Sequence, residues 1–530
     1  MIGSEILKRT KIFKLIQALE KREQLILAGA TLVFSASLLV LGILYFQTKT
    51  YLVAAEGGRF REGIVGQPAF IDPVLPSTEA DRDLAHIIFS SVADVSESIE
   101  AKENNTIWEV RLKDNIRWHD GERLTADDII FTLLVIQDPA AGSPLLPSFE
   151  GVAAERVSEL EVRFVLQGSY AFFGEDHLKN LRVIPKHIFA DIPVLNFKLS
   201  TQGLHPIGSG PYGVVSYEKD ADGLIKSIEL KANRNYPQKP KISTLQIKFY
   251  RNEADLIRAY NLGQIDGFGL TTAEPVADKV KIRHRTYALR APRYYAIFIN
   301  ESIAGEALKK LRVREALSAT IDRERLAQIF GGYATPLYGP TILTPNLIEE
   351  FDPALLQGLE LALIVPDEEF LTKTAGIVKE NWEAHGAKVS VEVYSIKDLA
   401  EQILVDNNYP LLLFGNITKE NQDLFAFWHS SRRFYPDQNL SLYEADDVDE
   451  LLEDYRKTAD PDERNEILKE VSDKITADVP AIFLYAPDYV YVASPQLGGV
   501  NEANIISTRD DRFNGIENWY VKTRRVFTRP

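Results

Sequence analysis

Residues 25–46 form an uncharged apolar run, LILAGATLVFSASLLVLGILYF, that limits the chain to a small set of architectures. As a helix this run would be about 33 Å long at about 1.5 Å per residue, enough to cross a bilayer core of about 30 Å. Six Lys or Arg and three Glu precede it. The positive-inside rule therefore places residues 1–24 in the cytoplasm. We expect a single transmembrane anchor at 25–46 and a large body on the extracytoplasmic side of the plasma membrane, periplasmic or at the cell surface.

Two other interpretations of this run remain. A cleaved signal peptide would use Val53-Ala54-Ala55 as its small-residue cleavage site, but the run is longer than the usual signal core of about 7–15 residues and its leader is long. A buried core helix would rarely extend this far without a charged face. An uncleaved anchor is favoured over both, and the body is exported whether or not the segment is cleaved.

The composition of the body excludes several classes of protein. At about 150 residues per domain, 530 residues suggest three or four domains, and 45% hydrophobic with 26% charged residues is typical of globular proteins. A net charge of -16 disfavours nucleic-acid binding. Cysteine is absent, which excludes disulfides, cysteine nucleophiles, thiolate metal sites and a lipidated cysteine anchor.

The expected pattern of strands and helices changes along the exported part. Residues 56–205 alternate short strands with a few helices, 205–300 favour strands, and 300–495 alternate strands and helices regularly. The last pattern predicts an α/β sheet with helices on its faces. Strands are predicted at 108–112, 212–218, 228–231, 245–250, 361–365, 388–394, 409–415, 481–484 and 489–492. Helices are predicted at 126–137, 253–262, 367–385, 396–405, 446–458 and 461–477.

We find no catalytic, cofactor or metal signature. The G-x-G-x-x-G match at 208–213 contains Pro211 and is followed by strand-like VVSYEK, so it predicts a turn and not a dinucleotide site. No two of the eight histidines have the i, i+4 spacing of a metal pair on a helix. His119, beside Asp120, is interpreted as a hydrogen-bonding residue at a strand end. The chain is therefore expected to be no enzyme, with no cofactor and no metal.

Several segments together resemble one known family. The segment VRLKDNIRWHDGERLTADDIIFTLLVIQD at 110–138 is similar to the segment by which family 5 extracellular solute-binding proteins, the dipeptide- and oligopeptide-binding type that supply ABC importers, are recognised. Similar segments follow in the family's order at 207–212, 262–266, 311–317 with 321–323, 331–336 and 447–485.

The resemblance implies an α/β fold of two lobes joined by a hinge and built from three domains. Domain I is expected at 56–85, 205–295 and 495–530, domain II at 86–204 and domain III at 296–494. The implied function is a bacterial, membrane-tethered solute receptor that binds a ligand, with a peptide as the favoured class, between its lobes and delivers it to an ABC transporter permease. Lobe closure would exclude water and strengthen backbone hydrogen bonds to an extended peptide.

The resemblance also suggests which residues face the ligand. Each aromatic among them has core packing as its alternative role, and Tyr295, Asn300, Asn416 and Trp428 are favoured. The candidate residues are Gly66, Gln67, Phe70, Tyr170, Phe172, Tyr294, Tyr295, Phe298, Asn300, Phe414, Gly415, Asn416, Thr418 and Trp428.

One departure from the family bears on the ligand. Peptide-binding members usually carry an aspartate shortly after the equivalent of Phe414-Gly415, where it pairs with the α-amino group, but Thr418 stands near that position here. Glu420 and Asp423 are the candidate substitutes. Three alternatives stay open: a non-peptide solute such as a metal complex, haem or a sugar; a chaperone or scaffold that uses the same cleft; and a surface hydrolase.

Overall fold

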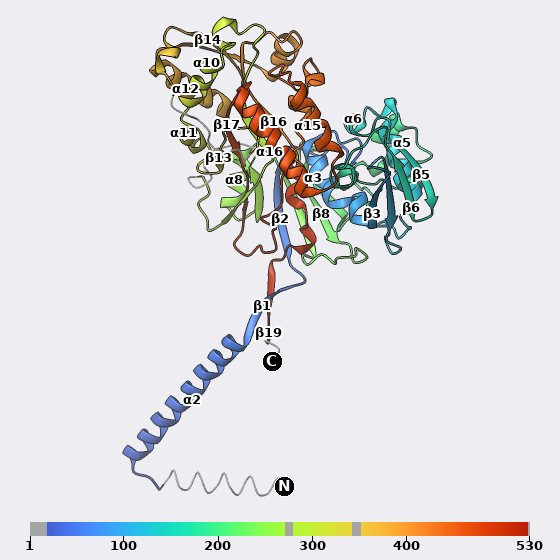
Figure 1. Cartoon of the computed structure of the whole chain (residues 1–530). Helices are drawn as coiled ribbons and strands as arrows, with labels where there is room; N and C mark the ends of the chain where they lie inside the picture. The colour runs from blue at the N-terminus through green and yellow to red at the C-terminus, as the bar shows by residue number, and fades with distance from the viewer. Residues whose placement is uncertain (1–17, 271–278, 342–350, 528–530) are drawn as a thin grey trace. The chain divides into compact units, whose positions relative to one another are not determined.

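The computed structural model describes residues 18–270, 279–341 and 351–527, which form two compact units (Figure 1). Residues 1–55 with 522–530 make one unit, and residues 56–521 make the other. The first holds helix α2 (Lys21–Lys49) and a two-stranded ribbon in which β1 (Thr50–Ala55) pairs antiparallel with β19 (Lys522–Phe527). None of the residues of α2 is buried, and among the described residues it is the one helix long and apolar enough to cross a membrane. It includes the whole predicted run 25–46, whereas residues 1–17 of the predicted cytoplasmic segment lie outside the described residues.

A seven-stranded sheet is the first of three sheets in the larger unit, with the order β11-β18-β10-β2-β9-β8-β7. β2 pairs in parallel with β10 and β9, and the other neighbours are antiparallel. Its strands are β2 (Arg59–Val65), β7 (Tyr212–Lys219), β8 (Ile225–Ala232), β9 (Thr244–Tyr250), β10 (Gly267–Leu270), β11 (Arg285–Leu289) and β18 (Tyr489–Ala493).

A four-stranded antiparallel sheet, ordered β3-β4-β6-β5, follows in the chain. Its strands are β3 (Ser96–Lys102), β4 (Ile107–Leu112), β5 (Ala153–Ser158) and β6 (Glu161–Val165). Helix α5 (Ala126–Gln137) begins where the Thr125 amide donates to the Asp128 carboxylate at 2.8 Å, a capping arrangement that satisfies an otherwise unpaired group at the helix start.

The third sheet has six strands in the order β13-β17-β12-β16-β14-β15. β14 pairs in parallel with both β15 and β16, as expected for strands joined by helices, and the remaining pairs are antiparallel. Hydrophobic clusters cover both faces of this sheet. In β12, Ile297 and Ile299 belong to the cluster on one face, and Phe298 belongs to the cluster on the other. Its strands are β12 (Arg293–Ile299), β13 (Ala334–Pro336), β14 (Glu360–Pro366), β15 (Lys388–Tyr394), β16 (Leu411–Ile417) and β17 (Ala481–Pro487).

Short and long helices connect these strands. The helices of the larger unit are α3 (Glu79–Ile88), α4 (Val92–Val95), α5, α6 (Leu146–Phe149), α7 (Lys186–Phe189), α8 (Glu253–Asn261), α9 (Gly305–Leu308), α10 (Leu311–Ala319), α11 (Arg323–Gln328), α12 (Glu369–Ala384), α13 (Ile396–Asp398), α14 (Phe425–Trp428), α15 (Asp446–Lys457) and α16 (Pro461–Asp478). Irregular helical turns include η2 (Phe173–Leu178), η7 (Leu399–Leu404) and η9 (Arg509–Phe513).

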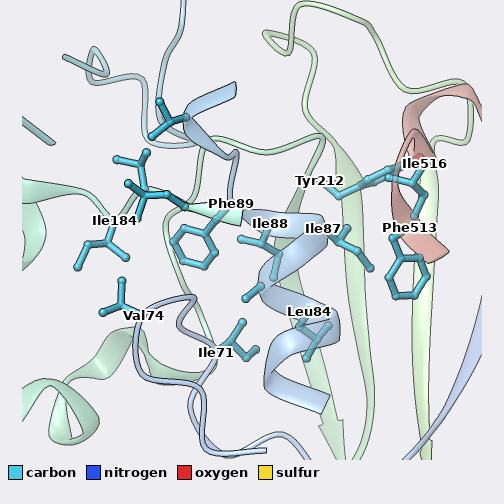
Figure 2. Packing of buried hydrophobic residues seen from close by; sticks show 14 of the residues in the cluster. Ile71, Val74, Leu84, Ile87, Ile88, Phe89, Ile184, Tyr212, Phe513 and Ile516 are labelled. Carbon is cyan, nitrogen blue, oxygen red and sulfur yellow. The ribbon is translucent and has the colours of Figure 1, made fainter. Parts of the chain in front are cut away.

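Helix α3 lies at the centre of the largest core (Figure 2). Its Leu84, Ile87 and Ile88 are fully buried among side chains from distant parts of the sequence, including Ile184 and Phe513. Burying a side chain of this size contributes roughly 1.5–3 kcal/mol relative to leaving it exposed. This core therefore fixes the start of the chain's body, the four-stranded sheet and the C-terminal segment against one another.

The glycine-rich turn at 208–213 is a packing element. A Cβ atom on Gly208 would lie 2.0 Å from the carbonyl oxygen of Ile88, so only glycine fits. The imidazole of His119 lies against the same turn, with Nε2 3.1 Å from the Gly210 carbonyl oxygen. The strand β7 begins at Tyr212, within the last two residues of this segment. The prediction of a turn here, and of a hydrogen-bonding role for His119, is confirmed.

Most predicted elements are present within one or two residues of their expected ends. β8 begins three residues before the strand predicted at 228–231, and β17 ends three residues after the strand predicted at 481–484. Two helical segments differ in kind. The helix predicted at 396–405 divides into α13 and a wider π-type turn, η7. The segment 311–323, which resembles one long helix, is two helices, α10 and α11, with a break at which Asp322 caps the second. The three sheets draw on the three predicted domain ranges, with three exceptions: β12 begins three residues inside the range 205–295, β18 joins the seven-stranded sheet, and β19 pairs with β1. The division into three domains stays a prediction.

Candidate ligand-binding site

A cavity of about 910 Å³ lies where six segments of the larger unit meet, and its volume is within the range of small-ligand pockets. It is much larger than a second hollow of about 580 Å³ beside Asn104 and Thr458. The lining segments fall within residues 73–86, 144–149, 175–182, 404–421, 427–440 and 505–514. They come from all three predicted domain ranges, so the cavity depends on how the sheets are assembled.

One wall of the cavity is the end of β16, where Phe414, Gly415 and Asn416 line the space. The Asn416 amide donates to the Tyr294 hydroxyl oxygen at 3.0 Å, and the indole N–H of Trp428 donates to the same oxygen at 3.1 Å. Burial raises the pKa of Tyr294, so this hydroxyl stays protonated. The three side chains form a fixed hydrogen-bonded group that orients the amide of Asn416 at the cavity wall.

Two ion pairs connect β16's following loop to η2 and the residues after it. Lys419 Nζ lies 2.9 Å from Asp176 Oδ2, and Lys179 pairs with Glu420. Asp176 is largely buried, whereas the other three side chains are about half exposed. Charges of opposite sign thus join the 86–204 range to the 296–494 range at the edge of the cavity.

His86 and Asp510 form a second polar group in the wall. His86 Nδ1 lies 2.9 Å from Asp510 Oδ2, and its Nε2 lies 2.9 Å from Asn514 Oδ1. Burial opposes ionisation of Asp510, but the hydrogen bond and charge of His86 outweigh it and hold its pKa below the usual range. One potential metal-ligating atom from each of His86, Asp510 and Asp511 lies within 4.8 Å of the other two. These three side chains are the donor set with which this cavity could hold a metal ion.

His177 contributes a neutral imidazole to the cavity. Burial lowers its pKa to about 4, and its ring stacks on Phe173 at 5.3 Å between centroids. Its Nδ1 is buried and lacks a hydrogen-bond partner within the described residues. At neutral pH this side chain therefore presents an uncharged aromatic nitrogen.

Three of the fourteen residues predicted to face a ligand line the cavity, namely Phe414, Gly415 and Asn416. The others lie elsewhere. Phe70, Phe172, Phe298 and Trp428 are buried in hydrophobic cores, where a large ring gains by packing. Tyr294 acts behind Asn416, and Tyr295 packs on Phe370 and Tyr485. Ligand contact by these residues stays a prediction.

The remaining predicted residues have backbone or local partners. The Gln67 amide bonds to both main-chain groups of Ile225, and Asn300 is fully buried and bonded to the Asn407 carbonyl oxygen. Tyr170 lies beside the Arg456 guanidinium, 5.4 Å from its ring centroid. Gly66 has a φ of 109°, which explains its glycine.

Neither proposed substitute for the family's amine-binding aspartate is free. The Thr418 hydroxyl donates to the Pro292 carbonyl oxygen at 3.0 Å. Glu420 lines the cavity but pairs with Lys179, and Asp423 pairs with Arg456 at 2.7 Å. A ligand ammonium at this wall would therefore have to compete with an existing ion pair.

Sequence reasoning missed the charged lining residues of the other walls, such as His86, Asp176 and Asp510. His86 and Asp510 are 424 positions apart, so no local motif marks them. The signal that could have found part of the set is the charged segment 175–182, EDHLKNLR, which has no regular apolar period.

Comparison with known proteins identifies the family. The model of "Bacterial extracellular solute-binding proteins, family 5 Middle" matches residues 91–434, more than half of the chain. The chain is a family 5 solute-binding protein. The resemblance inferred from the sequence is thereby confirmed.

Related proteins of known name cover most of this solute-binding protein. The oligopeptide-binding protein AppA of Bacillus subtilis is 22% identical over 520 residues, which is 88% of this chain and 92% of AppA. The nickel-binding protein NikA of Staphylococcus aureus is 23% identical over 430 residues, 74% of this chain and 80% of NikA.

Solved structures agree on the fold of this family 5 protein. AppA of Bacillus subtilis in complex with a nonapeptide matches with a TM-score of 0.65 at 22% identity, covering 89% of this chain and all of AppA. NikZ of Campylobacter jejuni in complex with Ni(L-His) matches with a TM-score of 0.65 at 21% identity, covering 87% of this chain and 99% of NikZ. The two-lobed binding-protein fold expected from the sequence is confirmed.

Proposed function

We propose that this solute-binding protein is a membrane-tethered receptor that binds a peptide in the 910 Å³ cavity and delivers it to an ABC importer. The observation that carries the proposal is the convergence of all three predicted domain ranges on one cavity whose wall holds an oriented amide, Asn416, and ionic groups of both signs. A peptide offers backbone donors and acceptors for such a wall and charged ends for its ions. AppA, which is similar over most of its length, is an oligopeptide-binding protein.

Binding and release need no covalent step. A ligand that contacts several segments at once stabilises the closed arrangement by its preference for that state, and the permease would reverse this preference. The cross-cavity pair of Lys419 and Asp176 adds to closure by joining two of the converging ranges. Bridging waters at a wide polar wall would let many side chains fit, which suits a receptor with broad specificity. We assign the protein no catalytic activity.

The strand that follows α2 in the chain supports the proposal that α2 is retained as an anchor. β1 begins at the residue after α2 and pairs with β19 over six positions, from Thr50 opposite Phe527 to Ala55 opposite Lys522. Cleavage after Ala55 would remove β1 and leave the edge of β19 unpaired, which costs its hydrogen bonds. An uncleaved helix also keeps the receptor at high effective concentration near a permease.

A metal chelate is the second candidate ligand. Two histidines, His86 and His177, line the cavity, and burial keeps His177 neutral and able to ligate. Two similar proteins are named for nickel or solved with Ni(L-His). The same cavity would then take a small metal complex in place of a peptide.

Titration of the full chain in detergent with a mixed peptide pool tests the proposal. A ligand that binds the folded state raises the free energy of unfolding by about 2.7 kcal/mol at a hundredfold excess over its Kd. We expect the unfolding temperature to rise with peptides and not in Ser148→Trp, which places an indole in the cavity lining. Ser158→Trp, on an exposed strand position, is the matched control. A rise with Ni²⁺ and histidine alone would favour the chelate, and no rise with either would refute both.

A further inference from the structure

The ribbon formed by β1 and β19 carries a basic cluster in an otherwise acidic protein. The chain has a net charge of -16, yet residues 47–55 and 518–527 contain Lys49, Lys522, Arg524 and Arg525 and no Asp or Glu. Lys522, Arg524 and Arg525 are all exposed. Within residues 18–270, 279–341 and 351–527, no carboxylate lies within ion-pair distance of these three side chains. Their charge is therefore available to a partner outside the chain.

The cluster is attached to the end of the membrane-spanning helix. Phe46, the last residue of the apolar run, lies 5.8 Å from Phe527 between ring centroids and 5.9 Å from the Arg525 guanidinium. Arg525 Nη1 also donates to Thr50 Oγ1 at 3.1 Å. These contacts fix the start of the ribbon to the last turn of α2, so the ribbon begins where the bilayer core ends.

The pairing register sets how far each charge stands from the helix end. Arg525 lies opposite Leu52, three residues beyond Lys49, and Lys522 lies opposite Ala55, six residues beyond it. At about 3.4 Å per residue these are roughly 10 and 20 Å along the ribbon. The headgroup layer extends about 5–7 Å beyond the hydrocarbon core, and the Debye length is about 8 Å at physiological salt. Arg525 is therefore within reach of lipid headgroups, Arg524, opposite Val53 at about 14 Å, lies at the limit, and Lys522 lies beyond it.

Exposed apolar side chains lie next to these charges. Tyr51, Leu52 and Phe527 are 52%, 58% and 56% exposed. Aromatic and aliphatic residues of this kind favour the interface between headgroups and acyl chains. A ribbon that combines them with unpaired arginines has the composition of a membrane-surface segment.

We propose that the β1–β19 ribbon binds acidic phospholipid headgroups of the outer leaflet through Arg525 and Arg524. This inference rests on the proposed retention of α2 as an anchor. A basic residue near an anionic surface is worth about 1 kcal/mol, or roughly a fivefold enrichment of acidic lipid. The ribbon would then hold the membrane-proximal end of the receptor at the lipid surface.

The absence of cysteine allows a local test on the full chain. Thr523→Cys, on the exposed ribbon, takes a fluorescent dye, and the protein is reconstituted in phosphatidylcholine vesicles that contain a minority of phosphatidylglycerol. Tracer lipids with a nitroxide on the headgroup quench by contact, so they sense the near leaflet only. We expect the phosphatidylglycerol tracer to quench roughly fivefold more than the phosphatidylcholine tracer at low salt. High salt should remove the difference.

Substitutions separate lipid binding by the ribbon from an effect of the protein's total charge. K522Q/R524Q/R525Q should abolish the preference for the acidic tracer, and among single variants R525Q should reduce it most and K522Q least. K309Q/K310Q/R312Q, which removes the same charge from the body, should leave it unchanged. Equal quenching by both tracers at low salt would overturn the proposal. Intact mass first establishes that α2 is present, so a cleaved chain is recognised as a failure of the anchor and not of the ribbon.

Discussion

Substitution of Tyr294 by phenylalanine tests the hydrogen-bonded group behind the cavity wall. The Tyr294 hydroxyl oxygen accepts from Asn416 Nδ2 at 3.0 Å and from Trp428 Nε1 at 3.1 Å. Tyr294 and Trp428 are almost completely buried. Removing one oxygen atom therefore leaves two donors without their acceptor while the ring remains in place.

The expected loss in the free energy of unfolding depends on whether each donor can find another acceptor. The Trp428 indole N–H is fully buried and cannot reach solvent, so its loss costs about 1–3 kcal/mol. Asn416 lines the cavity, where a water can accept from its amide, so its share is about 1 kcal/mol or less. We expect Tyr294→Phe to lower the free energy of unfolding by about 1–4 kcal/mol in total.

Urea unfolding of the full chain in detergent, followed by tryptophan fluorescence, measures this cost, with Trp428 as a reporter at the site. Tyr394→Phe removes a hydroxyl that bonds to Glu392 at the surface, at 3.3 Å, and should cost less than about 0.5 kcal/mol. A loss below about 0.5 kcal/mol in Tyr294→Phe as well would refute the hydrogen-bonded group described here.

Three further predictions concern stability. Arg512 is buried against Glu62, with Nε 3.2 Å from Oε1. Arg512→Leu should lower the free energy of unfolding in urea by about 3–5 kcal/mol, because it leaves a buried carboxyl group without its partner. A loss under about 1 kcal/mol would contradict the buried pair. Burial raises the pKa of Glu62 from 4.5 to about 7. The folded protein therefore binds a proton at Glu62 more tightly than the unfolded chain does, and the free energy of unfolding falls as the pH rises from 4.5 to about 7. Glu62→Gln should flatten this fall in a pH series of thermal unfolding, and an unchanged slope would disprove it. Gly208→Ala places a Cβ 2.0 Å from the Ile88 carbonyl oxygen and should lower the unfolding temperature strongly, whereas Gly168→Ala, with open space around it, should not; equal shifts would contradict the close packing.

Local sequence patterns predicted the elements well because the signals for helices and strands lie within a few residues. The helix at 126–137 has its cap and its stop in adjacent positions, and α5 has those bounds. The strand–helix–strand order at 361–415 likewise predicted a sheet with helices on its faces, and the strands of this segment do pair, β14 in parallel with β15 and β16. The divided helix at 396–404 was not predictable, because its wider turn is not visible in the apolar period of LAEQIL.

The candidate site was predictable only where one segment contributes several lining residues. Phe414, Gly415 and Asn416 are consecutive and follow a buried strand, so their place at the sheet's end could be inferred. His86 and Asp510 meet only because α3 and η9 pack together in the assembled core. Aromatic residues such as Phe298 could not be assigned from type alone, since the same ring serves a core or a cleft.

Mass spectrometry of the small molecules that leave the native full-length protein on denaturation tests the central claim most directly. The account predicts peptides released from the wild-type protein and from Ser158→Trp, and a marked loss of them in Ser148→Trp, whose indole occupies the cavity lining. Release of equal amounts from all three proteins, or of no small molecule from the wild type under conditions that retain bound solutes, would contradict it.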